Sequence, residues 1–329
     1  MPTMSTQSGN LISVIMPCYN AQNYIAAAIE SVLAQTHQRL ELIIINDGST
    51  DASEKVIQEF SDHRIRYFYQ NNSGQCIASN FGLKEANGDY IKFFDADDIM
   101  NEDHLAAQLE RLSHHDDCIA SCAWGRFYDG DVQSAKFVPE TVWRDMPPLE
   151  WIKAALRQKY DMMGAWVWLI PRKIIDKAGG WDERLSLNND FEFSMRLLMH
   201  ADEILFAPEA KLYYRSGSAT TLSQTNDRKK IEAALLSNEL GCSYLLQKED
   251  TEETRRLCAN RYQRWLYGIY PEFPDLQQHL QYKIAEFGGS TIRFDGGRAF
   301  QTLSKVVGWR MASRIKTSMR RFGYKKLPF

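Results

Sequence analysis

Three groups of acidic side chains are the residues of this sequence best suited to chemistry. Asp95 and Asp97 stand two positions apart, so an extended backbone would turn both carboxylates to the same side. Hard oxygen ligands of this kind suit Mg²⁺ or Mn²⁺ that bridges to phosphate groups. Asp47 follows an apolar run and offers acceptor oxygens to a base N–H or a ribose hydroxyl. Asp190 opens a predicted helix, where it is placed to act as a general base.

Each of these groups also has a purely structural interpretation. An isolated Asp-x-Asp is more often a solvated turn, in which Asp98 or Asn101 caps the next helix. The sequence around Asp47 is ordinary turn sequence and needs no ligand. Asp190 would stabilise a helix start through the helix dipole, which would also lower the pKa of its carboxyl and keep it ionised. The chemical interpretation therefore depends on whether the fold brings the three groups together.

The elements that must position these acids alternate between strands and helices. Apolar runs predict buried strands, and segments with helical spacing lie between them. Strands are expected at residues 11–16, 40–45, 65–69 and 90–94, and helices at 24–36, from Asp51, at 75–86 and at 101–113. This alternation predicts an α/β fold with a Rossmann-like, mainly parallel sheet flanked by helices. Because ligands of such sheets bind beyond the carboxyl ends of the strands, Asp47 and Asp95 should face one crevice.

The second half of the chain is expected to be mixed and then helical. Residues 166–170 predict a strand and residues 190–200 a helix, and helices are expected at 228–247, 252–267 and 275–287. The expected organisation is a flexible N-terminus (1–10), a catalytic domain (11–222), a helical extension (223–296) and a basic helix (297–329).

The charge of the chain is concentrated in its tail. The net charge is −3, but residues 297–329 hold nine Lys or Arg and no Asp or Glu, which leaves about −12 on the rest. An acidic body of this kind excludes a general nucleic-acid binder. Two interpretations of the tail stay open: a docked terminal helix with solvated charges, or a helix on an anionic membrane surface. The apolar series is Leu303, Val307, Met311 and Ile315, and the arginines on one face are Arg310, Arg314 and Arg321.

The cysteines and the hydropathy indicate a compartment. None of the six cysteines has metal-ligand spacing, which predicts reduced, buried thiols and favours the cytosol. Residues 1–10 lack the apolar segment of a signal peptide, and no apolar run approaches the ~20 residues of a membrane span. The sequence predicts a cytoplasmic protein, either free or peripheral on the inner face of the membrane.

Several motifs, taken in order, resemble the family 2 glycosyltransferases of the GT-A fold. The matching segments are residues 13–20, 45–51, 72–75, 78–82, 88–98 and 179–190. The resemblance covers roughly residues 11 to 220, and the order and spacing of several motifs make it specific. Three positions depart from the family pattern. Asn189 stands before Asp190 where relatives commonly carry Glu, and Ser79 stands where they often carry Arg. Many relatives carry a His after the position of Arg215, where this chain has residues 216–218, Ser-Gly-Ser.

The resemblance implies a site and a reaction. It implies metal-dependent, inverting transfer from a nucleotide-sugar, expected to be a UDP-sugar, to a surface glycan or its lipid-linked carrier. Asp190 would deprotonate the acceptor hydroxyl, and Asp97 with Asp95 would ligate Mn²⁺ or Mg²⁺. Trp181, just before that base, is a candidate for stacking against an acceptor sugar and is otherwise a core aromatic. The residues implied to bind the nucleotide-sugar are Pro17, Tyr19, Asp47, Asn72, Asp95 and Arg215.

Two other functions stay open. A nucleotidyltransferase on a related sheet is disfavoured, because no Gly-rich loop with Lys or Arg follows the first strand. A nucleotide-sugar-binding protein without turnover is disfavoured by the intact set of acids.

Overall fold

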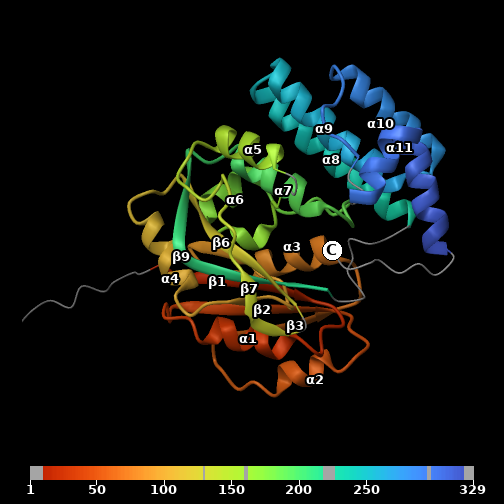
Figure 1. Ribbon diagram of the computed structural model, residues 1–329. Coiled ribbons are helices and arrows are strands. Elements are labelled where there is room, and N and C mark those ends of the chain that lie inside the picture. Colours follow the sequence, from red (N-terminus) through yellow and green to blue (C-terminus); the bar gives the residue numbers. More distant parts are fainter. Residues whose placement is uncertain (1–9, 129, 159–161, 218–226, 295–297, 322–329) are drawn as a thin grey trace, which may run out of the picture. The chain divides into compact units, whose positions relative to one another are not determined.

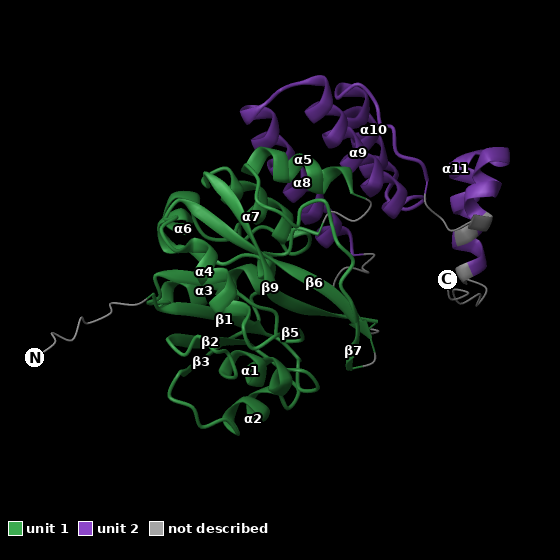
Figure 2. Cartoon of the chain, turned by 60° about the vertical axis from the view of Figure 1, so that its left-hand side comes forward, with its two compact units in different colours: residues 1–225 green, residues 226–329 purple. Residues whose placement is uncertain are grey.

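The computed structural model describes residues 10–128, 130–158, 162–217, 227–294 and 298–321 (Figure 1). The chain forms two compact units, residues 1–225 and residues 226–329 (Figure 2). Residues 1–9 of the expected flexible N-terminus and the expected boundary at 222/223 lie outside the described residues.

The first unit is built on a five-stranded sheet with the order β3-β2-β1-β4-β8. Four strands run parallel, as the sequence predicts: β1 (Ile12–Cys18), β2 (Leu40–Asp47), β3 (Ile65–Gln70) and β4 (Tyr90–Phe93). One face carries α3 (Gln75–Glu85) and the other carries α1 (Ile25–Leu33) and α2 (Ser53–Gln58) (Figure 1). Gly82 lets α3 approach β1 closely, because an added Cβ would lie 2.4 Å from Ile15 Cγ2. Burial on both faces explains the uninterrupted apolar runs of β1 and β2.

A second sheet, which the sequence did not predict, has the order β5-β9-β6-β7. Its longest pair, β6 (Cys118–Tyr128) and β9 (Glu203–Ser216), is parallel, with a register shift between Cys122 and Ala123. The outer strands are β5 (Ile99–Met100) and β7 (Asp131–Lys136), and α4 (His104–Leu112) packs against β9 and β6. This sheet places the end of β9 beside the acidic turn that follows β4.

The expected strand at residues 166–170 is wrong. Residues Ala165–Val167 form a 3₁₀ turn, η1, and only β8 (Ile170–Pro171) pairs with β4, antiparallel. Leu169 forms a single antiparallel bridge with Ala120 of β6, but side chains rather than a neighbouring strand bind the carbonyls of Trp166 and Val167. Lys92 Nζ donates to the Trp166 carbonyl and Gln108 Nε2 donates to the Val167 carbonyl.

Helices make up the remaining described structure. The first unit adds α5 (Pro148–Arg157), α6 (Arg172–Ala178) and α7 (Asn189–Leu198). The second unit holds α8 (Arg228–Lys248), α9 (Glu252–Ile269), α10 (Pro274–Glu286) and α11 (Arg298–Arg321). The bounds of α8, α9 and α10 match the predicted helices within two residues at each end. The expected basic helix at 297–329 is interrupted at Gly308, and its residues 297 and 322–329 lie outside the described residues. No helix among the described residues is long and apolar enough to cross a membrane. All six cysteines are buried and free, as predicted.

A buried carboxylate, Glu41, ties the start of the sheet together. Glu41 Oε1 accepts from Ser13 Oγ and the Asn87 backbone N–H, both at 2.6 Å, and Oε2 accepts from Arg66 Nη1 at 2.9 Å. Burial alone would raise the pKa of Glu41, but these hydrogen bonds outweigh it and hold the pKa below its ordinary value. Since the folded-state pKa is depressed, Glu41 stabilises the fold above its ordinary pKa of 4.5 and loses that contribution as the pH falls.

We expect Glu41→Gln to lower the free energy of unfolding by about 2 kcal/mol at pH 7, because a buried network loses its charged acceptor. The loss should shrink below pH 4.5, where wild-type Glu41 itself takes up a proton. Urea unfolding at pH 7 and pH 4 measures both values. Glu85→Gln is the matched control: it removes the more exposed partner of the same Arg66 and should cost less than about 1 kcal/mol. An equal loss for both variants at both pH values would contradict this role of Glu41.

Candidate active site

Three carboxylates gather in the turn that follows β4. Ligand oxygens of Asp95, Asp97 and Asp98 all lie within 4.8 Å of one another. Asp98 is buried, and its Oδ1 accepts the Arg215 backbone N–H at 2.8 Å. Asp98 therefore does not cap α4, and Asn101 does not either, since its side chain bonds to the backbone of Glu209 and Lys211.

Burial and mutual repulsion dominate the electrostatics of this turn. Burial, then the charges of Asp190 and Asp97, raise the pKa of Asp95 well above its ordinary value. Burial, then Asp97 and Asp95, raise the pKa of Asp98 in the same way. The pKa of Asp97 is also raised by burial, although nearby Arg215 opposes the rise. The charge of Asp190 contributes to the first of these shifts, so Asp190 and Asp95 share one electrostatic environment.

The acidic turn fits a divalent cation. Its donors are all carboxylate oxygens, the ligand type that Mg²⁺ and Mn²⁺ favour. Asp98 Oδ2 is buried and has no hydrogen-bond partner among the described residues. A cation would offset the repulsion that raises the pKa values of Asp95 and Asp98.

Arg215, near the end of β9, binds the backbone and a carboxylate of the acidic turn. Its Nε donates to the Asp97 carbonyl at 2.8 Å, and its backbone N–H binds Asp98. The guanidinium lies between two aromatic rings, with its central carbon 4.6 Å from the Tyr24 ring centroid and 4.5 Å from that of Phe127. Arg215 thus fixes the backbone of the turn and brings one positive charge beside three carboxylates.

Asp190 lies in the first turn of α7, which follows Asn188 in a left-handed conformation. Its Oδ1 accepts the backbone N–H of Ala165 at 2.9 Å. Burial raises the pKa of Asp190, although the hydrogen bonds from Ala165 and from its own N–H work against the rise. The expectation that the helix dipole lowers this pKa is therefore wrong, because desolvation outweighs the dipole.

Two neutral amides connect α7 to the acidic turn. Asn189 Nδ2 donates to Gln75 Oε1, and Gln75 Nε2 donates to Asp95 Oδ1, both at 3.3 Å. Asn189 also donates to the buried Cys76 sulfur at 3.3 Å. The first residues of α3 therefore stand between the helix that carries Asp190 and the turn that carries Asp95.

Asp47 organises the loop that leads into α3. Its Oδ1 accepts from Gln70 Nε2 at 2.6 Å and from the Ser73 N–H at 2.8 Å, and its Oδ2 accepts from the Gly74 N–H at 2.9 Å. The backbone of Asn72 passes so close to Gly48 (φ +71°) that a Cβ added at Gly48 would lie 2.6 Å from the Asn72 nitrogen. Asp47 is only 3% exposed, so its visible contacts shape this loop, and direct contact with a nucleotide base stays a prediction.

Of the other residues predicted to bind the nucleotide, Tyr19 is the most accessible aromatic. It is 52% exposed in the loop after β1, whereas Pro17 is half-buried within β1, opposite Ile45. Asn72 is exposed, in the loop that Asp47 holds. Pro17, Asp47 and Asp95 all lie at or beyond the carboxyl ends of parallel strands, as the predicted crevice requires.

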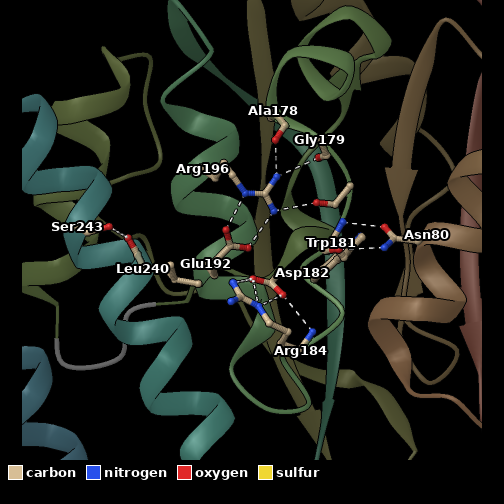
Figure 3. Close-up of polar contacts among 11 residues, drawn as sticks. Asn80, Ala178, Gly179, Trp181, Asp182, Arg184, Glu192, Arg196, Leu240 and Ser243 are labelled. Atoms are coloured by element: carbon tan, nitrogen blue, oxygen red, sulfur yellow. Dashed lines mark hydrogen bonds and ion pairs between the residues drawn. The ribbon is translucent and has the colours of Figure 1, made fainter.

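Trp181 belongs to the core of the segment between α6 and α7. It is 5% exposed, its ring stacks on Phe193 at 4.1 Å between centroids, and Phe93 meets it edge-on. Asn80 binds both its backbone N–H and its carbonyl (Figure 3). Arg196 holds the same segment through three carbonyls while it pairs with Glu192 (Figure 3). A stacking role for Trp181 against an acceptor sugar does not fit this burial.

The sequence does not reveal the residues that hold the candidate catalytic groups in place. Ala165 and Lys92 carry no motif signal, and Gln75 lies in a matching segment but had no expected role of its own, because these roles depend on contacts between elements far apart in the chain. Asp98 had a signal, as the fourth residue of the acidic run, but its expected role was a helix cap.

Comparison with known proteins agrees with this geometry. Residues 13–178 match the family described as glycosyl transferase family 2, so the chain belongs to this family. The uncharacterized glycosyltransferase RT0329 of Rickettsia typhi is 30% identical over 226 residues, which cover 68% of this chain and 70% of that protein. Glycosyltransferase GlyA of Streptococcus pneumoniae serotype 4 is 37% identical over 128 residues, which cover 38% of this chain and only 18% of GlyA.

A solved structure shares the fold over nearly the whole chain. S. aureus TarS 1–349 in complex with UDP-GlcNAc superposes with a TM-score of 0.68 at 18% identity, covering 96% of this chain and 93% of that one. This likeness supports the GT-A type α/β fold with its C-terminal helical region. Together with the family match, it identifies the protein as a glycosyltransferase, which favours glycosyl transfer over the two alternative functions.

The burial of Trp181 leads to a prediction about stability. Trp181→Ala should lower the free energy of unfolding by about 3–5 kcal/mol, because it opens a cavity between Phe93 and Phe193. Trp181→Phe should lose roughly half as much and keep its turnover of a nucleotide-sugar within about threefold of wild type. Urea unfolding and the rate of nucleoside diphosphate release measure the two effects. A Trp181→Phe variant that is fully stable yet more than tenfold slower would restore Trp181 to the acceptor site.

Proposed function

We propose that the protein transfers a sugar from a UDP-sugar to an acceptor hydroxyl with inversion at the anomeric carbon, aided by Mn²⁺ or Mg²⁺. The observation that supports the proposal is the cluster of Asp95, Asp97 and Asp98, whose oxygens lie within 4.8 Å of one another, and in which the charge of Asp190 helps to raise the pKa of Asp95. The UDP-GlcNAc complex of TarS, whose fold this chain shares, supports a UDP-sugar as the donor.

In this mechanism Asp190 accepts the proton of the acceptor hydroxyl as its oxygen bonds to the anomeric carbon. The bond from that carbon to the diphosphate oxygen breaks, and the nucleoside diphosphate leaves with the electron pair. Burial strengthens Asp190 as a base by raising its pKa, and the Ala165 N–H fixes the direction of its carboxylate. A divalent cation, when bound by Asp95 and Asp97, would neutralise charge that grows on the leaving diphosphate.

The other nucleotide-sugar contacts are proposed from their places around this turn. Tyr19 lies just beyond β1, Asp47 ends β2 and Asn72 lies just beyond β3, and we assign these three residues to the base and the ribose. Pro17 lies near the end of β1. Arg215 stands beside the acidic turn, where its charge suits the diphosphate. Together these residues would span a nucleotide from its base to its phosphates.

The first test of this function is a donor panel. Purified protein with Mn²⁺ should release UDP from one or more of UDP-GlcNAc, UDP-glucose and UDP-galactose, and chelation by EDTA should abolish the release. Asp190→Asn should bind the donor with a Kd within about twofold of wild type, yet release UDP roughly 10²–10⁴-fold more slowly. Asp97→Asn should lose the stimulation by Mn²⁺.

The matched control is Asp103→Asn, which removes an exposed acid before α4 and should keep wild-type rates. Unchanged transfer by Asp190→Asn would remove the base assignment. Equal rates with Mn²⁺ and with EDTA would remove the metal. Donor binding without any UDP release would favour a binding protein without turnover.

We further propose that α11 brings the enzyme to an anionic membrane surface, as a peripheral protein of the cytoplasmic face with a lipid-linked glycan acceptor. The helix bends at Gly308, and Trp309 packs on Tyr267 and Tyr270 within the second unit. Four of the nine exposed large hydrophobic side chains of the described residues nevertheless lie on this helix, next to exposed basic residues. They are Val306, Val307, Met311 and Met319, with Lys305, Arg310 and Arg314 beside them; the Arg321 side chain of the expected basic face lies outside the described residues.

The membrane proposal predicts co-sedimentation with phosphatidylglycerol vesicles and weaker binding at 0.5 M salt, since basic residues add about 1 kcal/mol each. The double variant Val307→Glu, Met311→Glu should lower the bound fraction at least threefold. Val138→Glu, which charges an exposed valine of the first unit, should not. Equal binding by both variants would contradict the role of α11.

A further inference from the structure

A buried lysine near the candidate active site has no carboxylate partner among the described residues. Lys92, in the middle of β4, is fully buried. Its ammonium group donates to His104 Nε2 at 2.9 Å, Gln108 Oε1 at 3.0 Å and the Trp166 carbonyl at 2.7 Å. These three acceptors use all three N–H bonds of the group, so its hydrogen bonding is complete although its charge is not paired.

The groups around Lys92 are arranged to accept hydrogen bonds from its ammonium group. His104 Nδ1 faces the Lys211 carbonyl at 3.2 Å, which assigns the ring hydrogen to Nδ1 and leaves Nε2 free to accept from Lys92. Burial, then the charge of Lys92, lowers the pKa of His104 well below its ordinary value, so the ring stays neutral. Burial also lowers the pKa of Lys92, to about 8, because desolvation disfavours the charged form.

The cluster of Lys92, His104 and Gln108 binds one short segment, the turn of residues 163–168. Lys92 holds the Trp166 carbonyl, and Gln108 Nε2 holds the Val167 carbonyl at 2.9 Å. From the other side, Ser194 Oγ of α7 donates to the Met163 carbonyl at 2.7 Å. The carbonyls of Met163, Trp166 and Val167 are therefore each bound by a buried side chain.

The same turn presents one N–H to Asp190. The Ala165 N–H lies between the fixed carbonyls of Met163 and Trp166 and donates to Asp190 Oδ1 at 2.9 Å. A turn whose carbonyls are held from β4, α4 and α7 cannot rotate this N–H away without breaking buried hydrogen bonds, which is costly. The direction of the Asp190 carboxylate thus depends on residues that never contact it.

We propose that Lys92 and Gln108 are positioning residues for glycosyl transfer, because they hold the turn of residues 163–168 so that the Ala165 N–H orients Asp190. An apolar residue in place of Lys92 would avoid the desolvation of a buried ammonium group, but it would leave the Trp166 carbonyl without its donor. This inference rests on the proposed role of Asp190 as the base.

The test uses two buried glutamines as a matched pair. Gln108 and Gln35 are both fully buried, and each donates twice to backbone carbonyls and accepts once. Gln108→Leu frees the turn, whereas Gln35→Leu removes a comparable set of bonds between α1 and the start of α4. Lys92→Met is a second variant at the turn.

Two measurements are made on the full chain: amide hydrogen exchange of a peptide spanning residues 162–169, and UDP release from UDP-GlcNAc with Mn²⁺. Gln108→Leu should exchange about tenfold faster in this peptide and lose at least about tenfold in kcat, while KM for UDP-GlcNAc stays within twofold. Gln35→Leu should change neither exchange in the peptide nor kcat by more than about threefold.

The outcomes separate this inference from the proposed function. If Asp190→Asn is inactive while Gln108→Leu and Lys92→Met keep their kcat, the base assignment stands and the positioning role is overturned. Equal losses of kcat in Gln108→Leu and Gln35→Leu would also overturn it, because the effect would then be one of general stability. If Asp190→Asn transfers normally, both proposals fall. Should Lys92→Met not fold, Gln108→Leu alone decides, and unchanged exchange in its 162–169 peptide overturns the inference.

Discussion

Repulsion among four carboxylates, of which Asp98 is buried and Asp95, Asp97 and Asp190 are half-buried, is the constraint on which this site depends. Asp95 and Asp98 have pKa values well above the ordinary range because burial and their acidic neighbours disfavour the charged form. Asp190 adds its charge to the same environment. Such a group of acids is unstable as a set of bare charges, so it takes up protons or a cation. Positive charge is therefore strongly favoured at the carboxyl ends of the parallel strands.

The scaffold meets this constraint with contacts from several elements. Arg215 reaches the acidic turn from β9, and Gln75 reaches it from the start of α3. Asp190 lies on α7, and its carboxylate accepts a hydrogen bond from the turn that Lys92 and Gln108 bind. Because each support comes from a different part of the chain, the second sheet and α7 are as necessary to the geometry as the parallel sheet that carries the acids.

The sequence predicts the parts of this arrangement that depend on local pattern. Buried strands and helices show their periodicity, so the four parallel strands and most helices were predicted nearly to their ends. The second sheet was not, since β6 and β9 pair across some eighty residues without a distinctive pattern. The apolar residues 166–170 predict one strand, but buried side chains bind the carbonyls of Trp166 and Val167, and only Leu169 and Ile170 pair with neighbouring strands. The pKa of Asp190 was misjudged for a similar reason: burial is a property of the fold, whereas the helix dipole can be read from sequence.

The amide at position 189 follows from the same electrostatics. Asn189 donates to Gln75 Oε1, which leaves Gln75 Nε2 to donate to Asp95. A carboxylate at position 189 could only accept, so it would compete with Asp95 for Gln75 Nε2 and add a further negative charge beside Asp190. Gln75 Nε2 would then donate to the residue at position 189 instead of to Asp95. An asparagine where relatives commonly carry an acid therefore keeps one more hydrogen-bond donor directed at Asp95, and the departure from the family pattern is consistent with the needs of the site.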